Sequence, residues 1–214
     1  MVWGIVAIGI VFAVVAYVVL QGTRASLAWR KAAAGGDVDV IRRMLEESIG
    51  SWGSMKRPKD VPPEVWRGVQ SVELVEVAAD SARVSCQVES EYRLVDGRWA
   101  ESGGPLQQGM AVTARLVDML LYDVPNLRLD GARVDVYTTF RDPDGESQRV
   151  CILTTNARRE VAREVDWEGS LPAEIVDALG GRYRLSERGA ALPIDPDDKA
   201  AIPALQDLGT QADP

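Results

Sequence analysis

The sequence predicts an α+β fold: an antiparallel sheet with helices packed on one face, preceded by one N-terminal transmembrane helix. Three observations predict it. The first 20 of the 214 residues carry no charged side chain. Apolar residues recur at the helical period between residues 38 and 49. Between residues 83 and 94, apolar and polar residues alternate, as in an antiparallel strand with one buried and one wet face.

The uncharged N-terminal run reads MVWGIVAIGIVFAVVAYVVL. Twenty helical residues span about 30 Å, the thickness of the hydrocarbon core of a bilayer. Trp3 and Tyr17 lie near the two ends of the run, where amphipathic rings favour the membrane interface. Gly9 and Ala13 form a small-xxx-small pair, which lets a second membrane helix approach closely. We therefore predict a transmembrane anchor over residues 1–22.

A cleaved signal peptide is the alternative reading of this run. Such a peptide has a basic segment before its apolar core, a shorter core and a small-x-small cleavage site. No Lys or Arg precedes Trp3, and the apolar run is longer than a signal peptide requires. Alanines between residues 25 and 34 offer only a weak processing site. The sequence thus favours a retained signal anchor.

Basic residues after the run predict the orientation of the anchor. Arg24, Arg30 and Lys31 follow it, whereas only the terminal amine stands before it. Because positive charge is retained on the cytoplasmic side, we expect a single-pass protein with its N-terminus outside and its soluble domain in the cytoplasm.

Charge is divided unevenly along the chain. Residues 24–67 hold nine Lys/Arg and six Asp/Glu, a net +3, whereas residues 68–214 hold fifteen and twenty-six, a net −11. This division suits an anionic lipid surface beside a basic neck, although the basic residues need do no more than fix topology. The acidic body argues against nucleic acid as a partner, because phosphate binding needs a concentrated basic face.

Four segments are predicted along the chain. After the anchor, residues 23–68 form a helical juxtamembrane neck and loop, in which Asp37 caps a helix over residues 38–49. Residues 69–189 form the α+β soluble domain. Residues 190–214, rich in Pro, Ala and Asp, form a disordered tail.

Within the soluble domain, the sequence pattern predicts strands and helices in alternating groups. The Asp96-Gly97 and Asp142-Pro-Asp-Gly145 sequences are typical hairpin turns. The predicted strands span residues 72–77, 83–94, 132–140, 148–155 and 183–185, and the predicted helices span 106–122, 157–165 and 171–179.

One short sequence occurs twice. Asp80-Ser-Ala-Arg-Val84 and Asp130-Gly-Ala-Arg-Val134 are fifty residues apart, and each opens a predicted strand. A duplicated ββα unit is one explanation. Chance identity in a chain rich in Arg, Val and Ala is the other.

The chain contains no histidine, which excludes every His-dependent catalytic triad and His-ligated metal site. No Walker A sequence and no GxGxxG after a strand occurs, so nucleotide binding has no support. Cys86 and Cys151 lie in predicted strands, 65 residues apart. In the cytoplasm we expect two buried free thiols, whereas an extracytoplasmic domain could pair them in a disulfide.

Two charged clusters have simpler explanations than a site. Asp142, Asp144 and Glu146 lack the further oxygen ligands of a calcium loop and belong to a hairpin turn. The Arg and Glu residues between 158 and 164 have the spacing for mutual salt bridges on a solvated helix face. The sequence predicts no catalytic residue, no metal site and no cofactor.

The leading functional expectation is a membrane-anchored, non-catalytic accessory module that recruits or stabilises a protein partner, or a second copy of itself. A ligand-binding or sensory domain with a pocket in a curved sheet is the alternative. A His-independent enzyme comes third. The residues expected to serve the anchor are Trp3, Gly9, Ala13, Tyr17, Arg24, Arg30 and Lys31.

Overall fold

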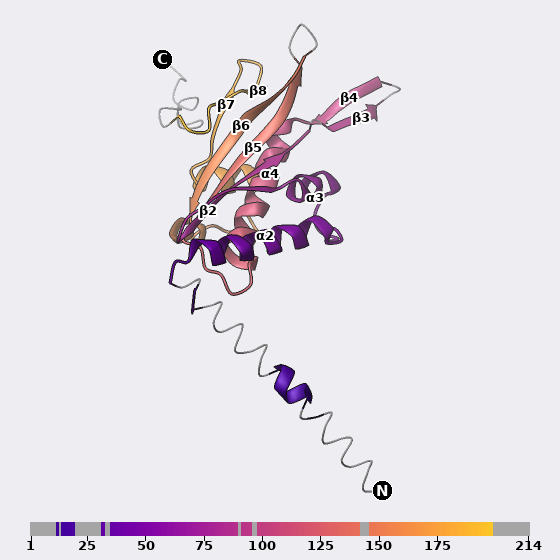
Figure 1. Ribbon diagram of the computed structural model, residues 1–214. Helices are drawn as coiled ribbons and strands as arrows, with labels where there is room; N and C mark the ends of the chain where they lie inside the picture. Colours follow the sequence, from indigo (N-terminus) through magenta and orange to yellow (C-terminus); the bar gives the residue numbers. More distant parts are fainter. Residues whose placement is uncertain are drawn as a thin grey trace, which may run out of the picture.

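A computed structural model describes residues 12, 14–19, 31–32, 35–89, 91–95, 98–141 and 146–198 (Figure 1). It has the mixed α+β architecture that the sequence predicts. The helices are α2 (Val38–Ser54), α3 (Pro63–Gln70), α4 (Pro105–Asp118), the π-helix η1 (Met119–Asp123), α5 (Arg159–Ala162) and α6 (Pro172–Ala178). The strands are β1 (Glu73–Val77), β2 (Ser81–Gln87), β3 (Glu91–Val95), β4 (Arg98–Gly103), β5 (Gly131–Arg141), β6 (Ser147–Arg158), β7 (Arg182–Leu185) and β8 (Ala191–Leu192).

The main sheet has six strands in the order β1-β2-β5-β6-β7-β8. The prediction of a purely antiparallel sheet is wrong at its centre, where β2 and β5 run parallel. Parallel neighbours need a crossover of a dozen or more residues, usually with a helix. Residues 88–130 supply that crossover and contain α4. Turn signals reveal hairpins between consecutive strands, but they do not reveal a pairing made through a helix.

The single long strand predicted over residues 83–94 is also wrong. Its first half is β2 in the main sheet, and its second half is β3, which pairs with β4 in a separate two-stranded hairpin. The backbone N–H of Val88 still donates to Tyr137 at the end of the β2–β5 pair. The alternation of apolar and polar residues therefore continues from β2 into β3, because both strands are extended, although they belong to different sheets.

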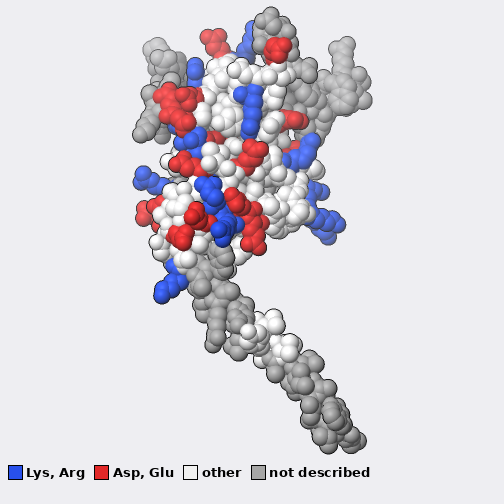
Figure 2. All heavy atoms as spheres, viewed as in Figure 1, with Lys and Arg blue, Asp and Glu red and all other residues white. Residues whose placement is uncertain are grey.

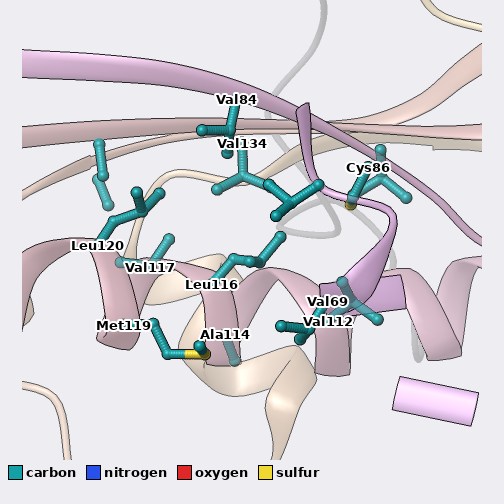
Figure 3. Packing of buried hydrophobic residues seen from close by; sticks show 14 of the residues in the cluster. Val69, Val84, Cys86, Val112, Ala114, Leu116, Val117, Met119, Leu120 and Val134 are labelled. Carbon is teal, nitrogen blue, oxygen red and sulfur yellow. The ribbon is translucent and has the colours of Figure 1, made fainter. Parts of the chain in front are cut away.

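Helix α4 fills the core against one face of the sheet. Figure 3 shows Val84 of β2 and Val134 of β5 facing Leu116 and Val117 of α4. All four side chains are fully shielded from solvent. The helix comes this close because Gly109 lies over Val136 and Leu153, where an added Cβ would stand 3.1 Å from Val136 Cγ1.

Helix α3 packs beside α4 on the same side of the sheet. At their contact, a Cβ on Gly68 would overlap Val112 Cγ2. Val69 of α3 lies close to Val112 in Figure 3. The glycine is thus the residue that sets the spacing of these two helices.

Several local predictions are confirmed. Asp37 caps α2, accepting hydrogen bonds from the backbone N–H groups of Asp39 (3.1 Å) and Val40 (3.2 Å). The β5–β6 pair is an antiparallel hairpin, and its turn at residues 142–145 lies outside the described residues. Strand β7 and helix α6 occur close to their predicted places.

Two predicted helix boundaries differ from the structure. Helix α2 continues to Ser54, beyond its predicted end at residue 49. A helix was expected over residues 157–165, but β6 continues to Arg158 and the helix α5 is one turn long. Beyond residue 189, where the predicted soluble domain ends, β8 pairs with β7, and the carbonyl of Pro196 accepts hydrogen bonds from Arg133 and Arg182. Contacts made far along the chain, which composition does not encode, order this segment.

Candidate functional site

Of the predicted anchor over residues 1–22, the structure describes residues 12 and 14–19, and these are helical. Tyr17 and Lys31 are described, and the side chains of both are exposed. Within the part of the chain that the structure describes, no helix combines the length and apolar character needed to cross a membrane. The other predicted anchor residues lie outside that part, namely Trp3, Gly9, Ala13, Arg24 and Arg30.

A groove of about 480 Å³ lies beside α2. Ile41 and Leu45 turn one stripe of α2 into the core, where both are fully buried. The neighbouring stripe lines the groove. Its apolar members are Met44, Trp52 and Met55, and its polar members are Arg43, Glu47, Ser48 and Ser51.

The second wall of the groove comes from the end of α4. The helix widens into η1, and π-helical turns often mark functional sites. Val124 leaves the helix with extended backbone, and Pro125 cannot donate a further helical hydrogen bond. Asn126 then adopts φ 62°, a left-handed conformation that Asn tolerates better than most residues. This turn places Asp123, Pro125 and Asn126 opposite α2.

The lining of the groove suits an apolar side chain flanked by charges. Met55 is 46% exposed, whereas Trp52 is buried. Methionine adapts its shape to irregular partners because its side chain is unbranched and polarisable. Arg43 and Glu47 on one rim and Asp123 on the other offer both signs of charge. The sequence predicted the first three turns of α2 but not its last turn, which carries Ser51 and Trp52. It also missed the groove, because the second wall is about seventy residues away.

A second candidate lies on the sheet face opposite α4. The parallel register pairs Arg83 with Arg133, so that two guanidinium groups flank Asp135. Asp135 Oδ2 lies 2.6 Å from Arg83 Nε, and its Oδ1 lies 3.1 Å from Arg133 Nε. The hydroxyl of Thr154 donates to the same Oδ1 at 2.5 Å. The carboxylate of Asp135 is 1% exposed, so each of its partners compensates for lost hydration.

The segment that follows β8 completes this arginine cluster. Asp197 Oδ1 lies 2.9 Å from Arg133 Nη2 and 3.1 Å from Arg83 Nη1. The carbonyl of Pro196 accepts from Arg133 at 2.6 Å and from Arg182 at 2.7 Å. The hydrogen bond from Arg133 is the main reason that the pKa of Asp197 is lowered.

The arginine cluster is neutral and internally satisfied. Burial acts to lower the pKa of Arg83, but the hydrogen bonds and charges of Asp135 and Asp197 outweigh it and raise the pKa. Arg83 and Arg133 balance the charges of Asp135 and Asp197. Arg182 joins only through the carbonyl of Pro196. The cluster therefore fastens residues 196–197 to the sheet and has the character of a structural device.

The sequence that occurs twice, at residues 80–84 and 130–134, contributes the two arginines of this cluster, Arg83 and Arg133. Ala82 pairs with Ala132, Arg83 with Arg133 and Val84 with Val134, so the two copies lie side by side in register. They do not occupy equivalent places in a duplicated ββα unit. Strand β2 pairs with the strand before it, whereas β5 forms its hairpin with the strand after it.

Both cysteines are buried free thiols. Cys86 pairs with Val136 on the α4 side of the sheet, and Cys151 pairs with Tyr137 on the other side. Burial raises the pKa of the Cys86 thiol, and it raises that of Cys151 to about 12. A disulfide would have to pass through the sheet.

Metal ligands do not gather in the described part of the chain, where no group of three Cys, Asp or Glu side chains could hold an ion. Asp142 and Asp144 lie outside it. Figure 2 shows acidic and basic side chains interspersed over the face in view, with no extended field of one sign.

Comparison with known proteins gives no relative for this chain: no protein family matches it, and no curated protein or solved structure is detectably similar.

Proposed function

We propose that this chain is a single-pass, membrane-anchored accessory module that binds a protein partner through the groove beside α2. The groove carries the proposal, because it combines adaptable apolar side chains with a rim of both charges. The partner presents an apolar side chain to Met44 and Met55 and charged groups to Arg43 and Asp123.

The anchor in this proposal rests on the uncharged run over residues 1–20 and on its interfacial Trp3 and Tyr17. Arg24, Arg30 and Lys31 after the run favour a cytoplasmic domain with the N-terminus outside. The mixed charge over the visible face supports a protein partner in preference to nucleic acid.

A non-catalytic role is supported by what the sequence and the core contain. The chain has no histidine to act as a general base near neutral pH. A ligand-binding sheet would need a cavity between the sheet and α4. Leu116, Val117 and Leu120 occupy that space and are essentially fully buried, so the binding module is favoured over the sensory domain.

Site-specific photocrosslinking in native membranes tests the proposal. A photoreactive phenylalanine analogue replaces Ser51, an exposed position that lines the groove. We expect one discrete protein adduct, which Met55→Asp in the same chain abolishes. The matched control carries the analogue at Arg188, an exposed residue outside the groove, and gives no such adduct.

An adduct of the same mass from both positions would contradict the proposal, because it would report crowding at the membrane and not a specific groove. Absence of any adduct from Ser51, with a chain that remains monomeric in mild detergent, would also overturn it.

A further inference from the structure

A second hollow of about 480 Å³ lies at the end of the sheet where β2 and β5 begin and β6 ends. Four arginines line it: Arg128, Arg158, Arg159 and Arg163. The expectation that the last three share one solvated helix face is wrong, because Arg158 closes a strand and Arg159 is buried. The hollow belongs to neither the α2 groove nor the arginine cluster around Asp135.

Arg159 forms the fixed wall of this basic pocket. Its Nε donates to the carbonyl of Leu129 at 2.5 Å, and Nη2 donates to the carbonyl of Leu121. Its guanidinium also lies over the ring of Tyr122, 5.0 Å from the centroid. Both hydrogen bonds go to carbonyl groups. No carboxylate of the described residues lies within ion-pair distance of Arg159, and the charge of Asp130 acts on it only from further away.

The other arginines are exposed and weakly paired. Arg128 Nε stands 3.9 Å from Asp130 Oδ1, which is too long for a hydrogen bond. Among the described residues, no carboxylate oxygen lies within ion-pair distance of Arg158 or Arg163. Their side chains are free to close on a ligand.

Charge within the pocket favours a singly charged anion. Asp80, Asp130 and Glu160 also line the hollow, so four positive and three negative groups leave a net +1. Burial is the main cause that lowers the pKa of Arg159, and repulsion from Arg128 and Arg163 adds to it. An anion between these guanidinium groups would relieve that repulsion. Guanidinium groups bind phosphate oxygens in strong, often bidentate hydrogen bonds.

The pocket also lies where the N-terminal segment enters the domain. Gly36 packs against Ala79, since an added Cβ would be 3.2 Å from Ala79 Cβ, and the next residue, Asp80, lines the pocket. Figure 1 shows the start of α2 and the lower end of β2 together at this end of the domain. If the chain is anchored as proposed above, this end of the domain is the one nearest the lipid headgroups.

We infer that the pocket lined by Arg128, Arg158, Arg159 and Arg163 binds the phosphate of an anionic lipid headgroup such as phosphatidylglycerol. This inference rests on the proposed membrane anchor. The same chemistry would accept free inorganic phosphate, and only the position of the pocket favours the lipid.

Titration calorimetry on the full-length protein in a neutral detergent tests the inference. The probes are dihexanoyl phosphatidylglycerol, dihexanoyl phosphatidylcholine and inorganic phosphate. We expect saturable binding of phosphatidylglycerol and none of phosphatidylcholine. The double variant Arg158→Gln/Arg163→Gln should weaken phosphatidylglycerol binding at least about tenfold, since each charge-assisted hydrogen bond is worth a factor of ten or more.

The matched control is Arg184→Gln/Arg188→Gln, which removes the same charge from exposed residues of β7 and its turn. It should change the affinity by less than about twofold, because screened surface charges contribute little. If both double variants weakened phosphatidylglycerol binding equally, the pocket would not be the binding site, and binding would depend only on the overall charge of the protein. If inorganic phosphate bound with the same affinity as phosphatidylglycerol, the inference that the ligand is a lipid headgroup would be wrong.

The Ser51 crosslink, repeated in the Arg158→Gln/Arg163→Gln chain, separates the two proposals. A retained adduct with lost lipid binding supports the phosphate pocket as a site distinct from the partner groove. An adduct that is lost together with lipid binding would overturn that separation.

Discussion

The two faces of the central sheet achieve burial by opposite means. On the α4 side, Val84, Val134 and Leu116 exclude water by packing apolar surfaces (Figure 3). On the other side, Asp135 is equally inaccessible but is held by two arginines and a threonine. Apolar packing is non-directional and tolerates local adjustment, whereas a buried carboxylate depends on every partner. The first face therefore supplies stability, and the second fixes where the chain after β8 lies.

The largest expected effect tests the packed face. Leu116→Ala should destabilise the protein by about 3 kcal/mol, because it removes a fully buried side chain and leaves a cavity. Urea unfolding of the purified full-length chain, followed by tryptophan fluorescence, measures this change. Val75→Ala on β1, where the side chain is 48% exposed, should change stability by less than about 0.5 kcal/mol. Similar losses at the two positions would show that α4 does not form the core.

The next effect tests the polar face. Asp135→Asn should cost about 2 kcal/mol, because Arg83 and Arg133 lose their shared countercharge but keep partial access to water. The control Asp130→Asn removes an exposed carboxylate and should cost less than about 0.5 kcal/mol. The same urea unfolding compares them. A neutral or stabilising Asp135→Asn would mean that the cluster contributes nothing to the fold.

Two helical glycines differ in the space around them, one at the α3–α4 contact and one on the surface of α2. Gly68→Ala should destabilise by about 1–2 kcal/mol, because the new methyl overlaps Val112 and forces α3 from α4. Gly53→Ala in α2 has open space around it and should stabilise by about 0.5–1 kcal/mol through helix propensity. Thermal unfolding of both variants checks these opposite signs. Two increases in Tm would show that the α3–α4 contact is loose.

The smallest effect concerns the segment fastened to the polar face. The lowered pKa of Asp197 means that its contribution is present above the pKa of the unfolded chain and is lost as pH falls through the folded value. Asp197→Asn should therefore lower stability slightly at pH 7, where the contribution is fully present, and the two proteins should become equally stable as pH falls from about 5 to about 2. Urea midpoints measured across this range test the difference. If the urea midpoints of the two proteins changed with pH in parallel, Asp197 would not contact the arginines in solution.

Sequence periodicity was sufficient to predict the elements whose form depends on residues close together in the chain. The helical period of residues 38–49 and the Asp37 cap predicted α2, and turn chemistry with alternation predicted the β5–β6 hairpin. These features depend on neighbours within a few residues. The same logic extended β2 too far, because alternation shows that a segment is extended but does not show which sheet it joins.

The sequence by itself determined the class of fold, the apolar faces of its helices, the absence of histidine and the uncharged N-terminal run. Tertiary structure alone decided the parallel β2–β5 pair, the groove between α2 and Asn126, and the pocket that Asp80 lines together with Arg128. The physical reason is separation along the chain. A side chain's own burial follows from local pattern, but each site joins groups far apart in the chain, such as Asp80 and Arg128 in the pocket.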